Sequence, residues 1–450
     1  LWRVQRRTAD MMSIALPTHS TTAGTADALS DSHGLRWRIH DAVILAFLVI
    51  MVGRSALPAL QEANFGISVD ANGGVTIRDL AAHVNFTRDF WLGKADYSVA
   101  SHVKTTDAWA GQPVGVALPF GYSPTMFYLL GPFCLVPTVW SYFFWTLISA
   151  AAVWWMTRRG RSWPVITPLV LLSPLALVCF SLGQTSLLTT LVILLLFLRH
   201  MECTADRIGS LHTLRGDLTL RADIIDALLL WTLTAKPPLA IAAGVALLAG
   251  RRWRAVTFGV LFTAVTTLAL TPQLGWDWPS QYLHLASNYD RQTADAAFAW
   301  SLRPDYMTNF RALLWSVGVG DALAAGLATL AWLTTSLGLA LIAVWKRLDP
   351  RFVWPLAVLS YLIFFPHVTS TEDLHLVLLV AVLATTGGLI ITGQHVAVIG
   401  FVLLVVFLAP GIVLETGGAR IALLLTAKLA IAALWLRFRF GQRTPPTALT

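Results

Sequence analysis

Charged side chains are scarce in this sequence. Only 12% of its 450 residues are Asp, Glu, Lys or Arg, whereas 56% are hydrophobic and the mean hydropathy is +0.66. A soluble domain carries about 25% charged residues, so a soluble globular protein is excluded. Apolar runs of roughly 20 residues, enough to cross a bilayer core as a helix, recur along the chain. The sequence therefore predicts an all-α polytopic membrane protein.

Cysteine and long polar stretches are also nearly absent. The three cysteines, Cys134, Cys179 and Cys203, form no Cys-x-x-Cys pair and no Cys/His spacing typical of zinc. Neither a disulfide framework nor a zinc site is expected. No stretch is long and polar enough for a separate soluble domain, so a Rossmann-like domain for a soluble nucleotide sugar is excluded.

Basic residues outnumber acidic ones, but they form small clusters. The formal net charge is +8, and clusters such as residues 251–254 and 346–351 lie between apolar runs. Under the positive-inside rule, such clusters mark cytoplasmic loops. The expected surrounding is therefore the lipid bilayer, and no nucleic-acid partner is expected.

The same rule predicts how the chain is organised. We expect a disordered cytoplasmic tail at residues 1–35, a single transmembrane domain at 36–440 and a cytoplasmic C-terminal tail at 441–450. Alternating the spans backward from the basic C-terminal end places an outer loop at about 273–320. A first span that enters from the cytoplasm places another outer loop at about 61–118. We expect roughly 11–13 transmembrane or re-entrant helices in this domain.

Two apolar runs are interrupted. The run 121–137 contains three prolines, and counting it as a full crossing would put the arginines that begin at Arg158 on the outer side. Either the run is re-entrant, which we favour, or these arginines violate the charge rule. The run 223–250 is broken at Lys236 and two following prolines. It is either two short helices meeting at a polar break or one kinked span.

The first outer loop carries a candidate catalytic acid. Apolar residues between Ile77 and Leu92 recur at near-helical spacing, which predicts an amphipathic helix on the membrane surface with Asp79 at its start. An acid in a first helical turn is often a cap or dipole partner. Alternatively, Asp79 is a general base, because inverting glycosyl transfer needs a carboxylate to deprotonate the acceptor hydroxyl.

Groups that could bind a phosphate leaving group are expected on the same side. Ionisable residues at membrane depth are functional candidates, although each could also be a boundary residue whose charged end reaches water. The candidates are His367, His375, Glu372, Asp373, Arg303 and Lys236. The spacing of the two histidines matches no metal-ligand set, so a divalent metal is possible but not indicated, and hydrogen bonding to sugar or phosphate is preferred.

The second outer loop is rich in aromatic residues. They are Trp276, Trp278, Tyr282, Tyr289, Trp300 and Tyr306. Such residues usually form an interfacial belt, and they could equally stack on sugar rings. A glycosylation sequon at Asn85 is a weak three-residue match, and we do not expect it to be used.

The order of several short signatures between about residues 40 and 440 resembles glycosyltransferase family 87. In chain order they are Asp79 with Gly93 and Tyr97; Tyr122, Ser123 and Pro124 with Gly131, Pro132 and Leu135 to Pro137; Gly183 and Gln184; Lys236 to Pro238 with Arg251 to Trp253; and Pro366 and His367 with Asp373 and Leu374. One departure is Thr125, where the family commonly has a second proline.

The resemblance implies a GT-C-like membrane enzyme that moves a sugar, with mannose favoured, from a polyprenyl-phosphate donor to a lipid or glycan acceptor. It implies a hexosyltransferase, with Asp79 similar to the family's base. The sequence itself indicates no cofactor. His367 and Asp373 would help form the donor pocket, with Gln184 and Lys236 lining the cavity and Tyr122 beside them. The site would face the periplasm or exterior from an inner membrane.

Two other classes remain open from the sequence. Broken helices and charges within the membrane are also typical of a transporter or lipid flippase. Against that class, no inverted repeat is visible, and the largest polar segments gather on one outer face. A non-enzymatic scaffold protein is the third possibility, and it predicts that Asp79 and His367 are dispensable.

Overall fold

The computed structural model describes most of the chain between residues 41 and 437. The described residues are 41–42, 44–50, 52–53, 66–69, 75–114, 118, 120–159, 173–209, 216–288, 307–386, 393–408 and 418–437. The chain divides into two compact units, residues 1–49 and 50–450. The second unit contains all the features considered below. The predicted tails at 1–35 and 441–450 lie outside the described residues.

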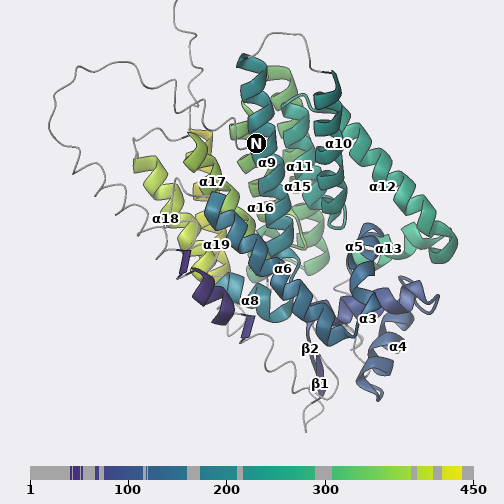
Figure 1. Cartoon of the computed structure of the whole chain (residues 1–450). Helices are drawn as coiled ribbons and strands as arrows, with labels where there is room; N and C mark the ends of the chain where they lie inside the picture. Colours follow the sequence, from purple (N-terminus) through teal and green to yellow (C-terminus); the bar gives the residue numbers. More distant parts are fainter. Residues whose placement is uncertain are drawn as a thin grey trace, which may run out of the picture. The chain divides into compact units, whose positions relative to one another are not determined.

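The described part of the second unit is built from helices and one small antiparallel ribbon (Figure 1). Its elements are β1 Ile67–Val69, β2 Val75–Ile77, α3 Asp79–Trp91, α4 Val99–Ala110, α5 Thr125–Leu130, η1 Gly131–Leu135, α6 Thr138–Arg159, α8 Pro174–Leu182, α9 Ser186–Gly209, α10 Gly216–Leu233, α11 Pro237–Ala249, α12 Trp253–Leu274, α13 Trp278–Asn288, α14 Phe310–Ser316, α15 Asp321–Lys346, α16 Pro350–Phe364, η4 Ser370–Leu376, α17 Val377–Thr386, α18 Gly393–Leu408 and α19 Gly418–Leu436. The ribbon pairs Ile67 with Ile77. The predicted all-α polytopic membrane fold is confirmed.

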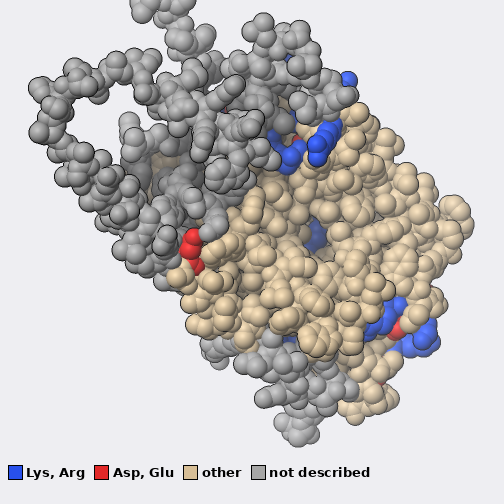
Figure 2. Space-filling view, viewed as in Figure 1, with Lys and Arg blue, Asp and Glu red and all other residues tan. Residues whose placement is uncertain are grey.

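Among the described helices, four are long and apolar enough to cross a bilayer, namely α6, α12, α15 and α19. Helices α8 and α9 would make a fifth span, although they are bent by 115° where they meet. Shorter apolar helices accompany them, among them α11, α16 and α18. On the face drawn in Figure 2, the described surface is largely uncharged, and Lys and Arg gather mainly at its two ends. This distribution is the one that a bilayer requires.

The proline-rich run before α6 is too short to cross a membrane. Helix α5 has six residues and η1 has five, which gives a length of about 20 Å at most against a bilayer core of ~30 Å. Arg88 on α3 holds the far end of this segment, because its guanidinium donates to the carbonyls of Cys134 (3.2 Å) and Val136 (2.7 Å). The chain then turns into α6. This is the geometry that the re-entrant interpretation requires.

The run 223–250 forms two separate helices. Helix α10 ends at Leu233 and α11 begins at Pro237. Arg252, just beyond α11, pairs with Asp223 and Asp226 (both 2.7 Å), which lie two to three turns before the end of α10. Helix α11 therefore returns alongside α10, and the two form an antiparallel hairpin. The two-helix interpretation is confirmed, with a hairpin turn between the helices.

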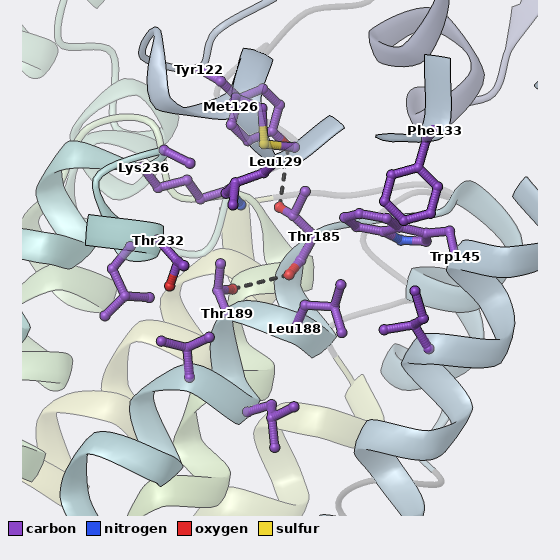
Figure 3. A pocket seen from close by; sticks show the side chains of 15 residues that line it. Tyr122, Met126, Leu129, Phe133, Trp145, Thr185, Leu188, Thr189, Thr232 and Lys236 are labelled. Atoms are coloured by element: carbon purple, nitrogen blue, oxygen red, sulfur yellow. Dashed lines mark hydrogen bonds between the residues drawn. The ribbon is translucent and has the colours of Figure 1, made fainter. Parts of the chain in front are cut away.

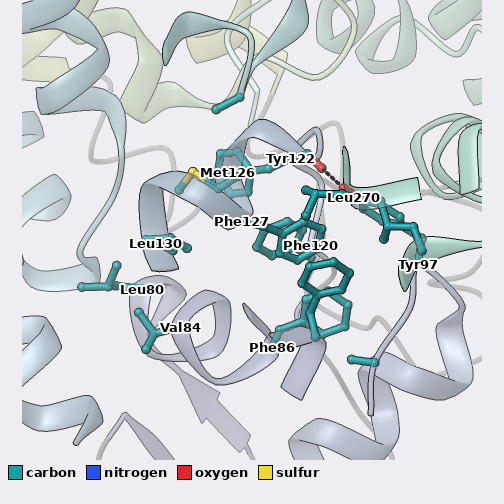
Figure 4. Packing of buried hydrophobic residues seen from close by; sticks show 14 of the residues in the cluster. Leu80, Val84, Phe86, Tyr97, Phe120, Tyr122, Met126, Phe127, Leu130 and Leu270 are labelled. Carbon is teal, nitrogen blue, oxygen red and sulfur yellow. Dashed lines mark hydrogen bonds between the residues drawn. The ribbon is translucent and has the colours of Figure 1, made fainter. Parts of the chain in front are cut away.

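The helix predicted after Ile77 is confirmed as α3, but protein covers its apolar face. Eight of its thirteen residues are buried. Phe90 and Phe120 each stack on Phe127, with ring centroids 3.8 and 4.8 Å apart, and Phe86 packs beside them (Figure 4). Aromatic pairs add about 0.5–1.5 kcal/mol beyond the burial of their area. The expectation that this face rests on lipid is therefore corrected, because α4, α5, η1 and α6 pack against the helix.

The side chain of Asn85 on α3 forms hydrogen bonds within the fold. Its Oδ1 accepts hydrogen bonds from Arg88 and from the hydroxyl of Thr138, both at 2.9 Å. Its amide nitrogen, the atom that a glycan would modify, is buried. The sequon is therefore closed to glycosylation in the folded protein.

Candidate functional site

Lys236 is positioned by the turn between α10 and α11. It is the N-cap residue of α11, and Pro237 opens the helix, where its missing N–H costs nothing. The turn is tied to the start of α5, because the Ser123 hydroxyl donates to the Thr234 carbonyl (2.5 Å) and the hydroxyls of Thr125 and Thr234 bond at 2.9 Å. These bonds fix the backbone from which the Lys236 side chain extends.

Glu372 in η4 is the ion-pair partner of Lys236. Its Oε1 accepts a hydrogen bond from the ammonium, and its Oε2 accepts one from the hydroxyl of Tyr361 on α16. The ring nitrogen Nε2 of His375 lies 3.7 Å from the same Oε2. The Glu372 carboxylate is buried, and the Lys236 ammonium and the Tyr361 hydroxyl favour its ionised form. Glu372 therefore holds the cation in place and is a poor candidate for the base.

His375 is fixed from behind by α9. Its Nδ1 lies 2.7 Å from the hydroxyl of Thr190. That hydroxyl also donates its one hydrogen to the Ser186 carbonyl at 2.6 Å, so it accepts from Nδ1–H of the histidine. The Nε2 edge of the ring is therefore the edge that faces Glu372. His375 is fully buried, and its Nε2 lies beside the Glu372 carboxylate without a hydrogen bond to it.

Asp373, the next residue in η4, belongs to a different cluster. Its carboxylate pairs with Lys428 on α19 (2.6 Å) and accepts a hydrogen bond from the Thr308 hydroxyl (2.7 Å). Lys428 also donates to the Thr308 carbonyl at 2.7 Å. The Asp373 and Lys428 side chains are both completely buried. Asp373 thus joins η4 to the last helix and to the chain before α14.

Asp79 is the first residue of α3, next to the N-cap residue Arg78. Its side chain is partly buried, and within the described ranges no hydrogen bond or ion pair reaches its carboxylate. Burial raises the pKa of Asp79 to about 7, and the ammonium of Lys236 offsets part of that rise. Such a carboxylate can take up a proton near neutral pH, as a general base must. The helix dipole also favours an acid at this position.

His83 is a site residue that the sequence analysis missed. It lies one helical turn after Asp79, so both occupy one side of α3. Its ring meets the edges of Tyr122 and Phe120, with centroids 4.9 and 5.6 Å away. Burial, followed by the charge of Lys236, lowers the pKa of His83 to about 3, so the ring is neutral. The i, i+4 spacing from Asp79 was the available signal.

A cavity of about 300 Å³ lies beside Lys236 (Figure 3). Its walls come from α5, η1, α6, α9 and α10 and are mostly apolar. Among the described residues that line it, Lys236 is the one charged residue. The lining residues are Tyr122, Met126, Leu129, Phe133, Trp145, Ile148, Thr185, Leu188, Thr189, Leu191, Val192, Thr232, Leu233, Ala235 and Lys236. An apolar chamber beside a single cation suits an amphiphile with an anionic head group.

Tyr122 connects the cavity to α3. Its hydroxyl bonds that of Thr185 (3.2 Å), its ring lies 5.7 Å from the Lys236 ammonium, and its ring edge meets His83. Gln184 precedes Thr185 at the bend between α8 and α9, and its side chain is partly buried. Of the two predicted residues, Tyr122 lines the cavity, whereas Gln184 lies next to a lining residue.

His367 lies apart from the Lys236 cluster, beside Arg311 on α14. The guanidinium and His367 Nδ1 are 3.4 Å apart, and Arg311 also forms a two-pronged ion pair with Asp321. Burial and the charge of Arg311 lower the pKa of His367 to about 3. His367 is therefore neutral and is not one of the described residues lining the cavity.

The segment predicted as the second outer loop, about 273–320, is described only in part. Trp278 and Tyr282 on α13 pack against Tyr97, with ring centroids 6.4 and 5.4 Å away, whereas Trp276 is 83% exposed. Arg303 lies outside the described residues, as do Tyr289, Trp300 and Tyr306. Across the described parts of the chain, no three His, Cys, Asp or Glu residues gather as a metal site.

The comparisons with known proteins give one match. The sequence model of glycosyltransferase family 87 matches residues 120–365, which is more than half of the chain. The matched segment includes Tyr122, Lys236 and the residues that line the cavity, whereas Asp79 and Glu372 lie outside it. No curated protein and no solved structure matches the chain.

Proposed function

Because the chain belongs to glycosyltransferase family 87, we propose that it moves a hexose, with mannose favoured, from a polyprenyl-phosphate donor to a lipid or glycan acceptor. The chain is a membrane glycosyltransferase, and the identities of its donor, sugar and acceptor are the proposal. A lipid-linked donor diffuses within the bilayer. The site that binds its head group must therefore be open to the bilayer next to the transmembrane helices.

The observation that carries this proposal is the cavity beside Lys236. Its described walls are mostly apolar, as an isoprenyl chain requires, and the one charged residue among them is a lysine, as a phosphate requires. The hydroxyls of Tyr122 and Thr185 lie at the same end and can bond phosphate or sugar oxygens. Glu372, His375 and Thr190 support the lysine from behind.

Asp79 is proposed as the general base. The acceptor hydroxyl gives its proton to the Asp79 carboxylate while its oxygen forms a bond to the anomeric carbon of the sugar. The bond from that carbon to the phosphate oxygen breaks, and its electron pair leaves with the lipid phosphate. The ammonium of Lys236 stabilises the negative charge that develops on the phosphate. The carboxylate is suited to this role because its pKa is raised to about 7.

We further propose that the site opens on the periplasmic or exterior side of an inner membrane. Support comes from the antiparallel hairpin, since Lys236 and Arg252 lie at its opposite ends. The positive-inside rule assigns the basic turn around Arg252 to the cytoplasm. Lys236, with Tyr122 and Asp79 near it, would then lie toward the outer face.

The test is transfer of labelled mannose from synthetic polyprenyl-phosphate mannose to a membrane lipid extract by the purified protein, beside Asp79→Asn. We expect wild-type transfer, and a variant that still binds donor but loses at least ~100-fold in rate, because one positioned base contributes about that much. Equal rates would refute the base and leave the transferase. Failure of both proteins across several sugars and extracts would favour a transporter or flippase.

A further inference from the structure

The Lys236 ammonium lies between a carboxylate and the cavity. It forms an ion pair with Glu372 on η4, and it also lines the cavity wall. Glu372 itself is not one of the described residues that line the cavity. A phosphate that enters the cavity therefore meets an ammonium whose charge is already partly neutralised by a neighbouring anion.

Glu372 is held firmly in this position. Tyr361 donates to one of its oxygens, and His375, itself bonded to Thr190, lies beside the same oxygen. Tyr361, Glu372 and His375 are all buried. Moving the carboxylate away from Lys236 would break these contacts, so Glu372 remains next to the ammonium when a ligand arrives.

Glycosyl transfer changes the charge of the lipid that the site holds. A sugar-phosphate donor is a phosphodiester with one negative charge, whereas the lipid phosphate left after transfer is a monoester with nearly two at pH 7. A bare ammonium would therefore bind the product more tightly than the substrate, and the product would block the next turnover.

We propose that Glu372 is a fixed competitor for the Lys236 ammonium, which weakens the hold on the lipid phosphate product and speeds its release. This inference rests on the proposed function. The effect falls more strongly on the product, because the carboxylate repels two charges more than one.

The first experiment measures binding to the full-length protein in detergent. The probes are farnesyl phosphate, its methyl diester and uncharged farnesol, and the proteins are wild type and Glu372→Gln. We expect the variant to bind farnesyl phosphate at least about tenfold more tightly, with a smaller gain for the diester and none for farnesol. Weaker binding of both phosphates would show that Glu372 only orients Lys236, and would overturn the proposal.

Tyr361→Phe is the matched control. It removes a hydrogen bond to Glu372 but keeps both charges, so we expect no gain in affinity for farnesyl phosphate. If Glu372→Gln does not fold, Glu372→Asp replaces it, because the shorter side chain draws the carboxylate back from Lys236. Tighter binding of farnesyl phosphate by Glu372→Asp supports the proposed competition for Lys236, and unchanged or weaker binding overturns the proposal.

The second experiment measures turnover with added product. In Glu372→Gln, we expect farnesyl phosphate to inhibit transfer at about tenfold lower concentration, and we expect the rate of repeated turnover to fall more than the rate of a single turnover. A change in the single turnover alone contradicts a role in release. If wild type transfers no sugar but the affinity gain is present, the proposed function fails and the competition for Lys236 stands. Transfer without the affinity gain refutes only the competition.

A bilayer phospholipid offers the same phosphate chemistry, so phosphatidic acid is tested as a competitor of farnesyl phosphate. We expect it to compete at least about tenfold less well, because a cavity of about 300 Å³ has room for one short isoprenyl chain but not for two acyl chains. Equal competition would show that the cavity holds a bilayer phospholipid, and the role in product release would be wrong.

Discussion

The two ends of the α10–α11 hairpin both bury charged groups, yet they differ in how completely those charges are satisfied. At one end, Arg252 pairs with Asp223 and Asp226, and Arg199 pairs with Asp226 at 2.6 Å. Two cations meet two carboxylates there. At the other end, Lys236 pairs with Glu372 but also borders a cavity.

A second carboxylate at the Lys236 end has no such compensation. Within the described residues, Asp79 has no hydrogen bond or ion pair, and burial raises its pKa to about 7. A closed cluster can only stabilise the fold, whereas an open one retains capacity for a ligand and a proton. The comparison therefore predicts that lesions at the Arg252 end affect stability, and lesions at the Lys236 end affect catalysis.

The largest expected effect is on stability. Arg252→Met leaves Asp223 and Asp226 buried without their shared cation, which should lower the free energy of unfolding by about 3–5 kcal/mol. Titration with SDS in mixed micelles measures this loss. The matched control is Arg254→Met, two residues away and exposed, which should change little. Transfer per folded molecule should equal wild type, and a lower rate would show that the closed end also serves catalysis.

Lys236→Met should have its main effect on the rate of transfer. Removing this charged group from the cavity wall should lower kcat by about 10²–10³, the usual effect of losing a preorganised hydrogen-bond donor. The single variant leaves Glu372 buried and unpaired, so Lys236→Met combined with Glu372→Gln is the control for folding. The double variant should regain stability without regaining rate. Recovered rate would mean that Lys236 is structural.

The sequence predicted the helical membrane fold and the break at Lys236 because both depend on local patterns. Long apolar runs require helices in lipid, and Lys-Pro-Pro interrupts a helix wherever it occurs. The burial of α3 was not predictable in this way. A face of Phe86 and Phe90 suits lipid and protein equally well, and only the packing of Phe120 and Phe127 against it decides between them.

The site was predictable as a set of residue types but not as a set of partners. Glu372 and Asp373 are adjacent in sequence, yet one pairs with Lys236 and the other with Lys428. Nothing local distinguishes them, because their partners lie more than fifty residues away in either direction. Lys428 carried a signal that we did not use, since a charge inside an apolar span is a candidate by default.

A smaller loss of stability is expected for a substitution at Thr190, which lies behind the Lys236 end of the hairpin. Thr190→Val removes the acceptor for the Nδ1–H of His375, leaving a buried donor unpaired at a cost of about 1–3 kcal/mol in the free energy of unfolding. Thr146→Val on α6 is the matched control, because its hydroxyl bonds only the Tyr142 carbonyl of its own helix. We expect Thr190→Val to cost more than Thr146→Val, and equal losses would mean that His375 finds another partner.

The last contrast between the two ends lies in the pH dependence of transfer. A base must be deprotonated to act, so kcat/KM should fall about tenfold per pH unit below the pKa of Asp79, which is about 7. Because Lys236 lowers that pKa, Lys236→Met should move the acid limb to higher pH, whereas Arg252→Met should leave it in place. Profiles of the residual activity, measured from pH 5 to 9, check this. If both variants shift the limb equally, the electrostatic separation of the two ends is wrong, and the pKa of Asp79 responds to cations throughout the fold.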